Sequence, residues 1–302
     1  MRRAGRNSAF SLAMLGLGFV FLYAPIISLV VYSFNESRLV TVWAGFSTKW
    51  YGELFADRQL MDSAWVSLRV AFNTAWSAVV IGTMAAMMLV RFRRFRGKTL
   101  FGALITAPLV MPEVITGLSL LLLFVHLGEL LGTPIMRGMG TIWIAHTTFA
   151  TAFVTVVVAS RLTEMDRSLE EAAMDLGANR VKVFFIITLP LILPALAAGW
   201  LLAFTLSLDD LVIASFVSGP ASTTLPMKVF SSVRMGVSPK INALATIWIA
   251  AVAIAAVFAW RVMARGERKR RARLHGANRN SKARRASQCT GLDTSIDRAQ
   301  AR

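Results

Sequence analysis

Three acidic residues within long apolar runs are the side chains most able to do chemistry in this 302-residue chain. Asp209 and Asp210 follow an uncharged stretch that begins at Val183, and Glu113 stands directly after Pro112, where a broken helix is expected. A carboxylate at the centre of a bilayer costs about 2.5–3.5 kcal/mol on insertion scales, so its presence usually serves function. Because a carboxylate accepts charge-assisted hydrogen bonds from an alkyl ammonium, these acids are candidates to line a path for a cation.

A structural role for the same acids remains an alternative. Either aspartate could cap the end of its helix or pair with a basic residue such as Lys228 or Arg234. Successive helical residues point about 100° apart, so the two aspartates cannot face one path equally. If the path carries a cation, the aromatic faces of Trp200 and Phe204 could add cation–π attraction.

A second distinctive segment, residues 168–177, combines acidic side chains with apolar ones at helical spacing. Ser168 and Glu171 have the spacing of a capping box, and Gly177 suits the left-handed residue that ends a helix. The apolar residues recur on one helical face: Leu169, Ala172, Ala173 and Leu176. The acidic residues are Glu170, Glu171 and Asp175. We expect a short amphipathic helix whose charge suits a basic partner protein better than an anionic membrane surface, although membrane packing alone remains an alternative.

The elements that must position these residues are membrane spans. Hydrophobic residues make up 56% of the chain and charged residues 16%, which excludes a soluble nucleic-acid binder despite the net charge of +17. The single cysteine, Cys289, excludes an internal disulfide and a Cys-based metal site. A spanning helix needs roughly 20 mostly apolar residues. Six runs meet this length: residues 7–35, 70–90, 99–128, 138–160, 183–208 and 241–260.

The basic residues predict how the six spans are oriented. Of the 33 Lys and Arg residues, 25 fall on one side, thirteen of them from Arg261 onward. We therefore expect an all-α integral membrane protein with six transmembrane helices, both termini in the cytoplasm and a cytoplasmic helix between spans four and five. The expected divisions are a basic arm (1–9), the first span (10–34), an external loop (35–64), a core of spans two to six (65–264) and a basic, disordered tail (265–302).

Other residues within the runs are expected to serve packing. His126 and His146 have no partner ligands at metal spacing, so interhelical packing or hydrogen bonding is expected for both. Four glycines are expected to allow close helix approach: Gly82, Gly102, Gly117 and Gly199. The tail lacks aromatic residues interleaved with its basic ones, so no nucleic-acid partner is expected.

The acidic segment also resembles a known sequence motif. The motif elements, at fixed spacing, are Glu171-Ala172-Ala173, Gly177, Ile187 and Leu189-Pro190. They are similar to the EAA loop of the inner-membrane permeases of ABC importers, which here spans residues 164–190. Residues 106–112 and 206–210 look like the corresponding segments of the polyamine-uptake members of that family, and the likeness covers roughly residues 12–264.

The resemblance implies partners and roles. In this family the EAA loop docks into a groove of a cytoplasmic ATPase, which implies an ATPase-coupling role for five residues: Glu171, Ala172, Ala173, Asp175 and Gly177. It further implies an ATPase dimer, a second homologous permease subunit and a periplasmic substrate-binding protein. The implied cargo is a polyamine, most closely putrescine, which crosses the bacterial inner membrane by alternating access.

No catalytic residue, cofactor or metal is expected in the chain itself. The run Arg96-Gly97-Lys98-Thr99 lacks the upstream glycine of a phosphate loop, so ATP hydrolysis is assigned to a separate subunit. Three alternatives remain: an ABC permease for another cargo such as spermidine or thiamine, an ion-coupled secondary transporter, and a membrane-embedded enzyme. The last two are disfavoured, because the sequence has neither an internal repeat nor a nucleophile–base set within the spans.

Overall fold

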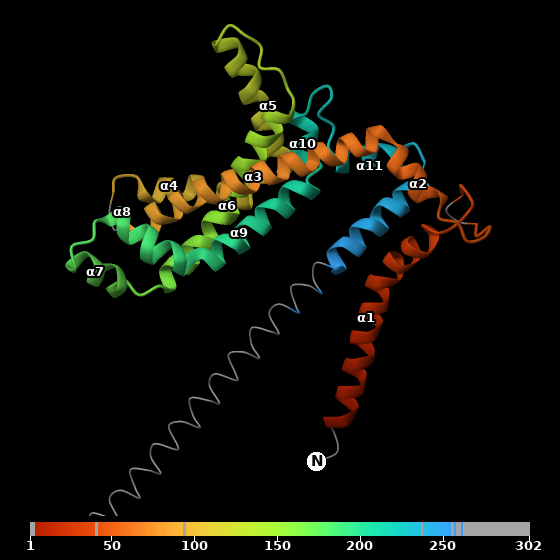
Figure 1. Cartoon of the computed structure of the whole chain (residues 1–302), viewed down its shortest axis with the longest axis horizontal. Coiled ribbons are helices and arrows are strands. Elements are labelled where there is room, and N and C mark those ends of the chain that lie inside the picture. The colour runs from red at the N-terminus through yellow and green to blue at the C-terminus, as the bar shows by residue number, and fades with distance from the viewer. Residues whose placement is uncertain are drawn as a thin grey trace, which may run out of the picture. The chain divides into compact units, whose positions relative to one another are not determined.

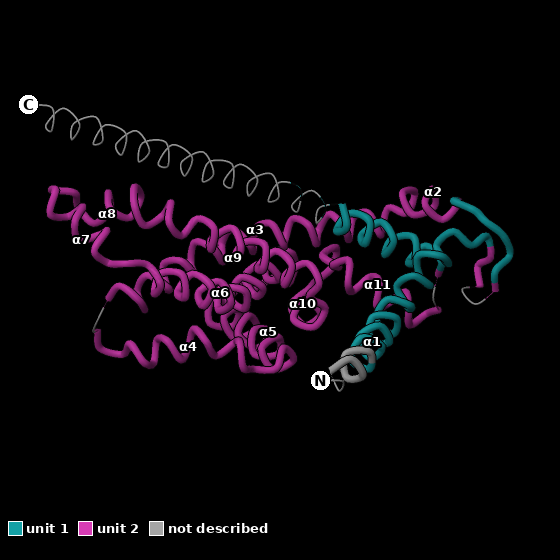
Figure 2. The backbone as a smooth tube through the Cα atoms, turned by 90° about the horizontal axis from the view of Figure 1, so that it is seen from below, with its two compact units in different colours: residues 1–36, 43–48, 239–302 teal, residues 37–42, 49–238 magenta. Residues whose placement is uncertain are grey.

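The computed structural model describes residues 4–39, 42–92, 95–236, 238–254, 257 and 261. Within these residues the regular structure is helical, and the single extended pairing is an isolated bridge between Asn35 and Phe46. The chain divides into two compact units, residues 1–36, 43–48 and 239–302 in one and residues 37–42 and 49–238 in the other (Figure 2). The predicted all-α class is confirmed for the described residues, and the predicted tail (265–302) lies outside them.

The first unit contains α1 (Ala4–Tyr32) and a helix over Pro239–Ile254. Residues Phe10–Tyr32 of α1 are long and apolar enough to cross a membrane. After α1 the chain folds back on itself, since Ser47 N–H donates to the carbonyl of Phe34 at 2.7 Å. The sixth predicted span is described up to Ile254, while residues 255, 256 and 258–260 of that prediction lie outside the described chain.

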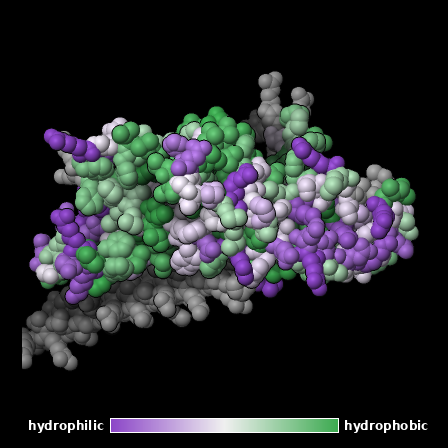
Figure 3. Space-filling model, turned by 90° about the horizontal axis from the view of Figure 1, so that it is seen from above, coloured by the Kyte–Doolittle hydropathy of each residue, from purple (hydrophilic) through white to green (hydrophobic). Residues whose placement is uncertain are grey.

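The second unit is built around three long helices that lie side by side, α3, α6 and α9 (Figure 1). Its elements in chain order are α2 (Lys49–Ala56), α3 (Arg58–Arg91), α4 (Lys98–Val110), α5 (Glu113–Leu130), α6 (Met139–Glu164), α7 (Ser168–Asp175), α8 (Arg180–Val183), the π-helical turn η1 (Phe184–Thr188), α9 (Leu189–Asp209), α10 (Val212–Val217) and α11 (Leu225–Arg234). Figure 3 shows a broad hydrophobic area on the visible face, with hydrophilic side chains gathered toward its ends.

Five described helical segments are long and apolar enough to cross a membrane: Phe10–Tyr32, Arg58–Arg91, Glu113–Leu130, Met139–Glu164 and Arg180–Asp209. The third predicted span, 99–128, is two helices, because α4 ends at Val110 and α5 begins at Glu113. Pro112 disfavours a helical conformation at the residue before it, so the expected break is confirmed. Figure 1 shows α5 turning sharply away from α4.

Small residues let α3, α6 and α9 approach closely. The buried cluster that joins them is rich in alanine: Ala75, Ala78, Ala86, Ala150, Val154, Val158, Leu162, Ile192 and Ala203. A methyl group added at Gly82 would lie 2.9 Å from Val154 Cγ1, and one at Gly199 would lie 3.3 Å from the same atom. Both glycines therefore provide close approach, as predicted, because helices in a membrane associate through packing of small residues.

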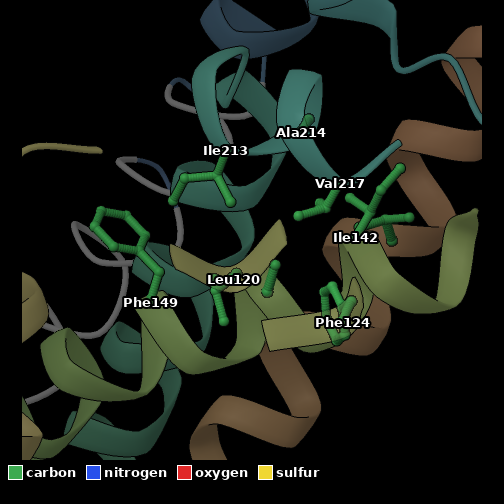
Figure 4. Close-up of a cluster of buried hydrophobic side chains, with 9 residues drawn as sticks. Leu120, Phe124, Ile142, Phe149, Ile213, Ala214 and Val217 are labelled. Carbon is green, nitrogen blue, oxygen red and sulfur yellow. The ribbon is translucent and has the colours of Figure 1, made fainter. Parts of the chain in front are cut away.

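A second buried cluster joins α5 and α10 to α3 and α6 (Figure 4). Its members are Val70, Leu120, Phe124, Ile142, Ala145, Phe149, Ile213, Ala214 and Val217. A methyl group at Gly117 would lie 2.7 Å from the Phe216 ring, so the prediction for Gly117 is confirmed. The prediction for Gly102 is wrong, because its nearest neighbour, Leu89 Cδ2, would stand at an ordinary contact distance of 3.6 Å.

Candidate functional site

The connection between α6 and α9 contains the short helix expected from the sequence, α7, which begins at Ser168. The predicted capping box is wrong, because Ser168 is the first helical residue and no side chain caps the preceding Arg167. The backbone N–H of Ser168 instead donates to Asp166 Oδ1 at 2.9 Å. Hydrogen bonds from the backbone and side chain of Ser168 hold the pKa of Asp166 below its usual range. Asp166 thus accepts the Ser168 N–H, which a capping box would pair with the Glu171 carboxylate.

The other end of α7 follows the prediction. Gly177 adopts φ +86°, the left-handed conformation that favours glycine. Its N–H donates to the carbonyl of Met174 at 2.9 Å, and the N–H of Ala178 donates to the carbonyl of Ala173 at 3.1 Å. This pair of bonds forms a Schellman motif, which satisfies carbonyls left free at the helix end.

The residues singled out for ATPase coupling lie on and directly after α7. Glu171, Ala172, Asp175 and Gly177 are exposed and Ala173 is half-buried. The apolar stripe faces outward as well: Leu169 is 49% exposed and Leu176 is 90% exposed. An eight-residue helix that presents both acids and apolar side chains to solvent leaves a surface able to contact another protein.

Glu170, the acid beside Glu171, has a different environment. Its carboxylate lies 3.0 Å from Nε of Arg91 at the end of α3. It also accepts a hydrogen bond of 2.8 Å from the Thr188 hydroxyl in η1. The resemblance to the EAA loop gave a role to Glu171 alone, and nothing local to residues 170 and 171 reveals that Glu170 faces these partners.

The two aspartates after α9 also differ. The Asp210 carboxylate accepts hydrogen bonds from the N–H groups of Ala214 at 2.8 Å and Ile213 at 3.4 Å, so it caps the beginning of α10. Its Oδ2 lies 3.1 Å from Nε2 of His146, with both side chains almost fully buried. His146 Nδ1 lies 2.8 Å from the hydroxyl of Ser207. Asp210 is therefore held in a buried polar cluster that ties α6 to the junction of α9 and α10.

Asp209, by contrast, is exposed. Asp209 is the last helical residue of α9, and Asp210 follows it as the C-cap residue. Because successive residues are rotated by about 100° around a helix axis, the side chain of Asp209 does not share the buried direction of Asp210. Of the two acids, Asp209 is the one whose carboxylate is accessible to a cation.

Glu113 is exposed at the first position of α5, where a negative charge is favourable beside the helix N-terminus. Trp200 and Phe204 stack with ring centroids 5.2 Å apart, and Trp200 also meets the Trp76 ring of α3 at 6.2 Å. At about 100° of rotation per residue, the nine residues from Trp200 to Asp209 place these two side chains about 180° apart around α9. The aromatic cluster and Asp209 therefore lie on different sides of this helix.

Comparison with known proteins identifies the family. Residues 78–271 match the family described as binding-protein-dependent transport system inner membrane component. The chain belongs to this family. It is 64% identical over 264 residues to the putrescine transport system permease protein PotI of Escherichia coli strain K12, a match that covers 87% of this chain and 94% of that protein. It is 43% identical over 251 residues to the spermidine/putrescine transport system permease protein PotC of the same strain, covering 83% and 92%.

Solved structures agree on the fold. A crystal structure of a bacterial ABC transporter involved in the import of the acidic polysaccharide alginate matches with a TM-score of 0.66 and 18% identity, over 85% of this chain and 96% of that chain. The family match and the two relatives confirm the permease resemblance drawn from the EAA loop. The protein is an inner-membrane transport component and not an enzyme.

Proposed function

We propose that the chain is the permease subunit of an ATP-driven importer that carries putrescine across the bacterial inner membrane by alternating access. The observation that carries the proposal is the 64% identity to a putrescine permease over 94% of that protein's length. The exposed carboxylate of Asp209 at the end of α9 is compatible with a cationic cargo, which favours a diamine over an anion. Spermidine is the second candidate, because the chain is 43% identical to a spermidine/putrescine permease over 83% of its length.

The proposed topology has six spans, with both termini in the cytoplasm, a first span over 10–34 and a core over 65–264. The five span-length helices support it, together with the shorter apolar helices Lys98–Val110 and Pro239–Ile254. The strong bias of basic residues toward one side supports the orientation. Accessibility of single introduced cysteines to a membrane-impermeant reagent, in a Cys289→Ser background, tests each loop in turn.

We assign α7 and Gly177 as the coupling element that contacts a cytoplasmic ATPase dimer. The exposed acids and apolar stripe of α7 support this role, since both kinds of side chain require a complementary protein surface. In the assembled importer a second homologous permease and a periplasmic substrate-binding protein complete the system. Nucleotide-driven closure of the ATPases would move α7 and bias the spans between inward- and outward-facing states.

Docking at α7 is tested with Ala172→Arg, which places a long cationic side chain on its exposed face. The variant is expected to lose the ATPase during affinity purification of the complex. Met136→Arg is the matched control, because Met136 is 88% exposed and lies on a different connection. Equal recovery of the ATPase with both variants would contradict docking at α7.

Within the pathway we assign the cation-facing role to Asp209. Asp209→Asn keeps the size of the side chain and removes its charge. Putrescine uptake is expected to fall about tenfold or more, since a hydrogen bond to a charged group contributes roughly 1.5–3 kcal/mol. Glu129→Gln is the control, because Glu129 is an exposed acid at the far end of α5. Unchanged uptake by Asp209→Asn would remove Asp209 from the pathway.

The cargo is tested in cells without other polyamine uptake, in which the chain is expressed with its ATPase, second permease and binding protein. Labelled putrescine is expected to enter, and an excess of unlabelled putrescine is expected to compete better than spermidine. The reverse order of competition would assign spermidine as the main cargo. Uptake that persists without the ATPase subunit would instead favour an ion-coupled transporter.

A further inference from the structure

A compact polar cluster links α7 to the helices that form the core of the second unit. At its centre is Glu170, whose Oε1 accepts hydrogen bonds from Nε of Arg91 at 3.1 Å and from Thr188 at 2.8 Å. Arg91 is the last residue of α3, and Thr188 is the last residue of η1, directly before α9. One carboxylate therefore joins α7 to both α3 and the beginning of α9.

Two further hydrogen bonds strengthen the same junction. Nη1 of Arg91 donates to the carbonyl of Leu162 near the end of α6 at 3.2 Å. Nη2 of Arg167, the residue before α7, donates to the carbonyl of Val90 at 2.7 Å. Because α7 follows α6 in the chain, it is connected to all three core helices, by the backbone to α6 and through side chains to α3 and α9.

The burial of this cluster separates it from an ordinary surface ion pair. The side chains of Arg91 and Glu170 are 11% and 15% exposed. In the nearby pair Arg161–Glu164, which spans 3.5 Å, the side chains are 46% and 65% exposed. A partly buried, hydrogen-bonded pair is screened less by water and salt than an exposed one, so it can hold two elements together as one of them moves.

The surroundings of the cluster allow movement without separation of the pair. It borders a pocket of about 310 Å³, whose lining includes Met87, Phe92 and Met174. The buried Nη2 of Arg91 has no hydrogen-bond partner among the described residues. Arg91 thus retains a donor for a second acceptor when α7 shifts, and η1 adds a π-helical turn, a feature common at functional positions in helices.

We propose that Glu170, held by Arg91 and Thr188, is the joint that transmits displacement of α7 to α3 and α9. Glu170 is a positioning residue, since it faces the permease core rather than the ATPase. The inference rests on the proposed coupling role of α7. It adds that the exposed acid of the pair, Glu171, and the half-buried one, Glu170, have separate tasks: contact with the partner and connection to the spans.

The test uses the complete importer in proteoliposomes with its binding protein, and it measures uptake and ATP hydrolysis in the same samples. Glu170→Gln removes the charge while an amide oxygen remains for Thr188. We expect the ATPase to remain in the purified complex, while putrescine uptake per ATP hydrolysed falls roughly five- to tenfold, within the range of allosteric coupling. Thr188→Val, which removes only the hydroxyl, is expected to reduce the ratio in the same direction.

A double-mutant cycle shows whether the pair acts as a unit. Arg91→Gln combined with Glu170→Gln is expected to be no worse than either single change. The control cycle, Arg161→Gln with Glu164→Gln, is expected to leave uptake per ATP unchanged, because that pair is exposed. The proposal would be overturned if the losses of uptake per ATP in Arg91→Gln and Glu170→Gln were additive in the double variant. It would also be overturned if Glu170→Gln left uptake per ATP unchanged.

Three outcomes distinguish failure of this inference from failure of the proposed function. If the unaltered chain recovers no ATPase, the proposed function fails and the joint fails with it. If the unaltered importer couples uptake to hydrolysis and Glu170→Gln does too, only the joint fails. If both Glu170→Gln and Thr188→Val abolish assembly, the cluster is needed for folding, which also overturns a role in transmission.

Discussion

A close contact between α3 and α6 makes Gly82→Ala a decisive substitution. A methyl group at Gly82 would lie 2.9 Å from Cγ1 and 3.0 Å from Cβ of Val154, and 3.2 Å from the backbone nitrogen of Thr155. Val154 is fully buried in α6, and a backbone nitrogen cannot rotate away. The added methyl can therefore be accommodated only if α3 and α6 move apart.

Two opposing free energies set the size of the effect. Replacing glycine by alanine inside a helix gains about 1 kcal/mol of helix propensity. An extra methyl in a packed core costs typically about 1–3 kcal/mol. The expected net change is therefore from about zero to about 2 kcal/mol of destabilisation. Gly102→Ala isolates the clash, because the same propensity is gained where the nearest atom stands 3.6 Å away.

The assay heats the purified complex in detergent to a series of temperatures and measures the fraction that remains monodisperse. Gly82→Ala is expected to unfold at a lower temperature than Gly102→Ala, with Gly199→Ala between them because its contact with Val154 is 3.3 Å. Adding Val154→Ala to Gly82→Ala should cost less than the sum of the two single changes. Equal stability of Gly82→Ala and Gly102→Ala would refute the close approach of α3 and α6.

Three further predictions concern the polar groups. His146→Ala removes the ring beside the buried Asp210 carboxylate and is expected to destabilise the complex by about 1–3 kcal/mol, the cost of leaving a buried polar group without its neighbour. The same heating assay measures the loss, which Asp210→Asn in the same background should partly restore. Asp166→Asn is expected to speed amide exchange at Ser168. Because the pKa of Asp166 is lowered on folding, the stabilisation by its carboxylate is present above the ordinary carboxyl pKa and disappears as pH falls through the lowered value. Protection of the Ser168 amide that does not change with pH would contradict capping by Asp166. Gly177→Ala forces a left-handed conformation on a residue with a Cβ and should weaken the end of α7 by about 1–2 kcal/mol. The loss is measured as faster exchange of the backbone amides that follow Ala173. Gly140→Ala is the control, because its added methyl has open space.

The sequence determined which segments are helical and where several of them end. Uncharged runs of about 20 residues allow little except a helix in a bilayer, where each backbone polar group must be paired within the segment. Local chemistry likewise predicted the break before Glu113 and the left-handed Gly177. The capping box failed because Asp166 competes for the same N–H group, and local spacing alone does not decide between two nearby acceptors.

Packing distances required the tertiary structure. Gly82 and Gly102 have the same local character, yet of these two only Gly82 lies too close to the facing helix for a methyl group. Two pairs of neighbouring acids show the same limit. Sequence favoured Asp209 and Asp210 equally, but His146 and the first turn of α10 bury one of them. It favoured Glu171 over Glu170, and the structure connects Glu170 to Arg91, 79 residues away.

The physical reason is the rotation of the helix. Each residue turns the side chain by about 100°, so two identical neighbours can face opposite environments, and the buried direction is set by helices distant in the sequence. The sequence by itself determined that acids stand in the connection between α6 and α9 and at the end of α9, and that the chain is a membrane permease. Only the tertiary structure decided which acids hold the helices together and which face outward.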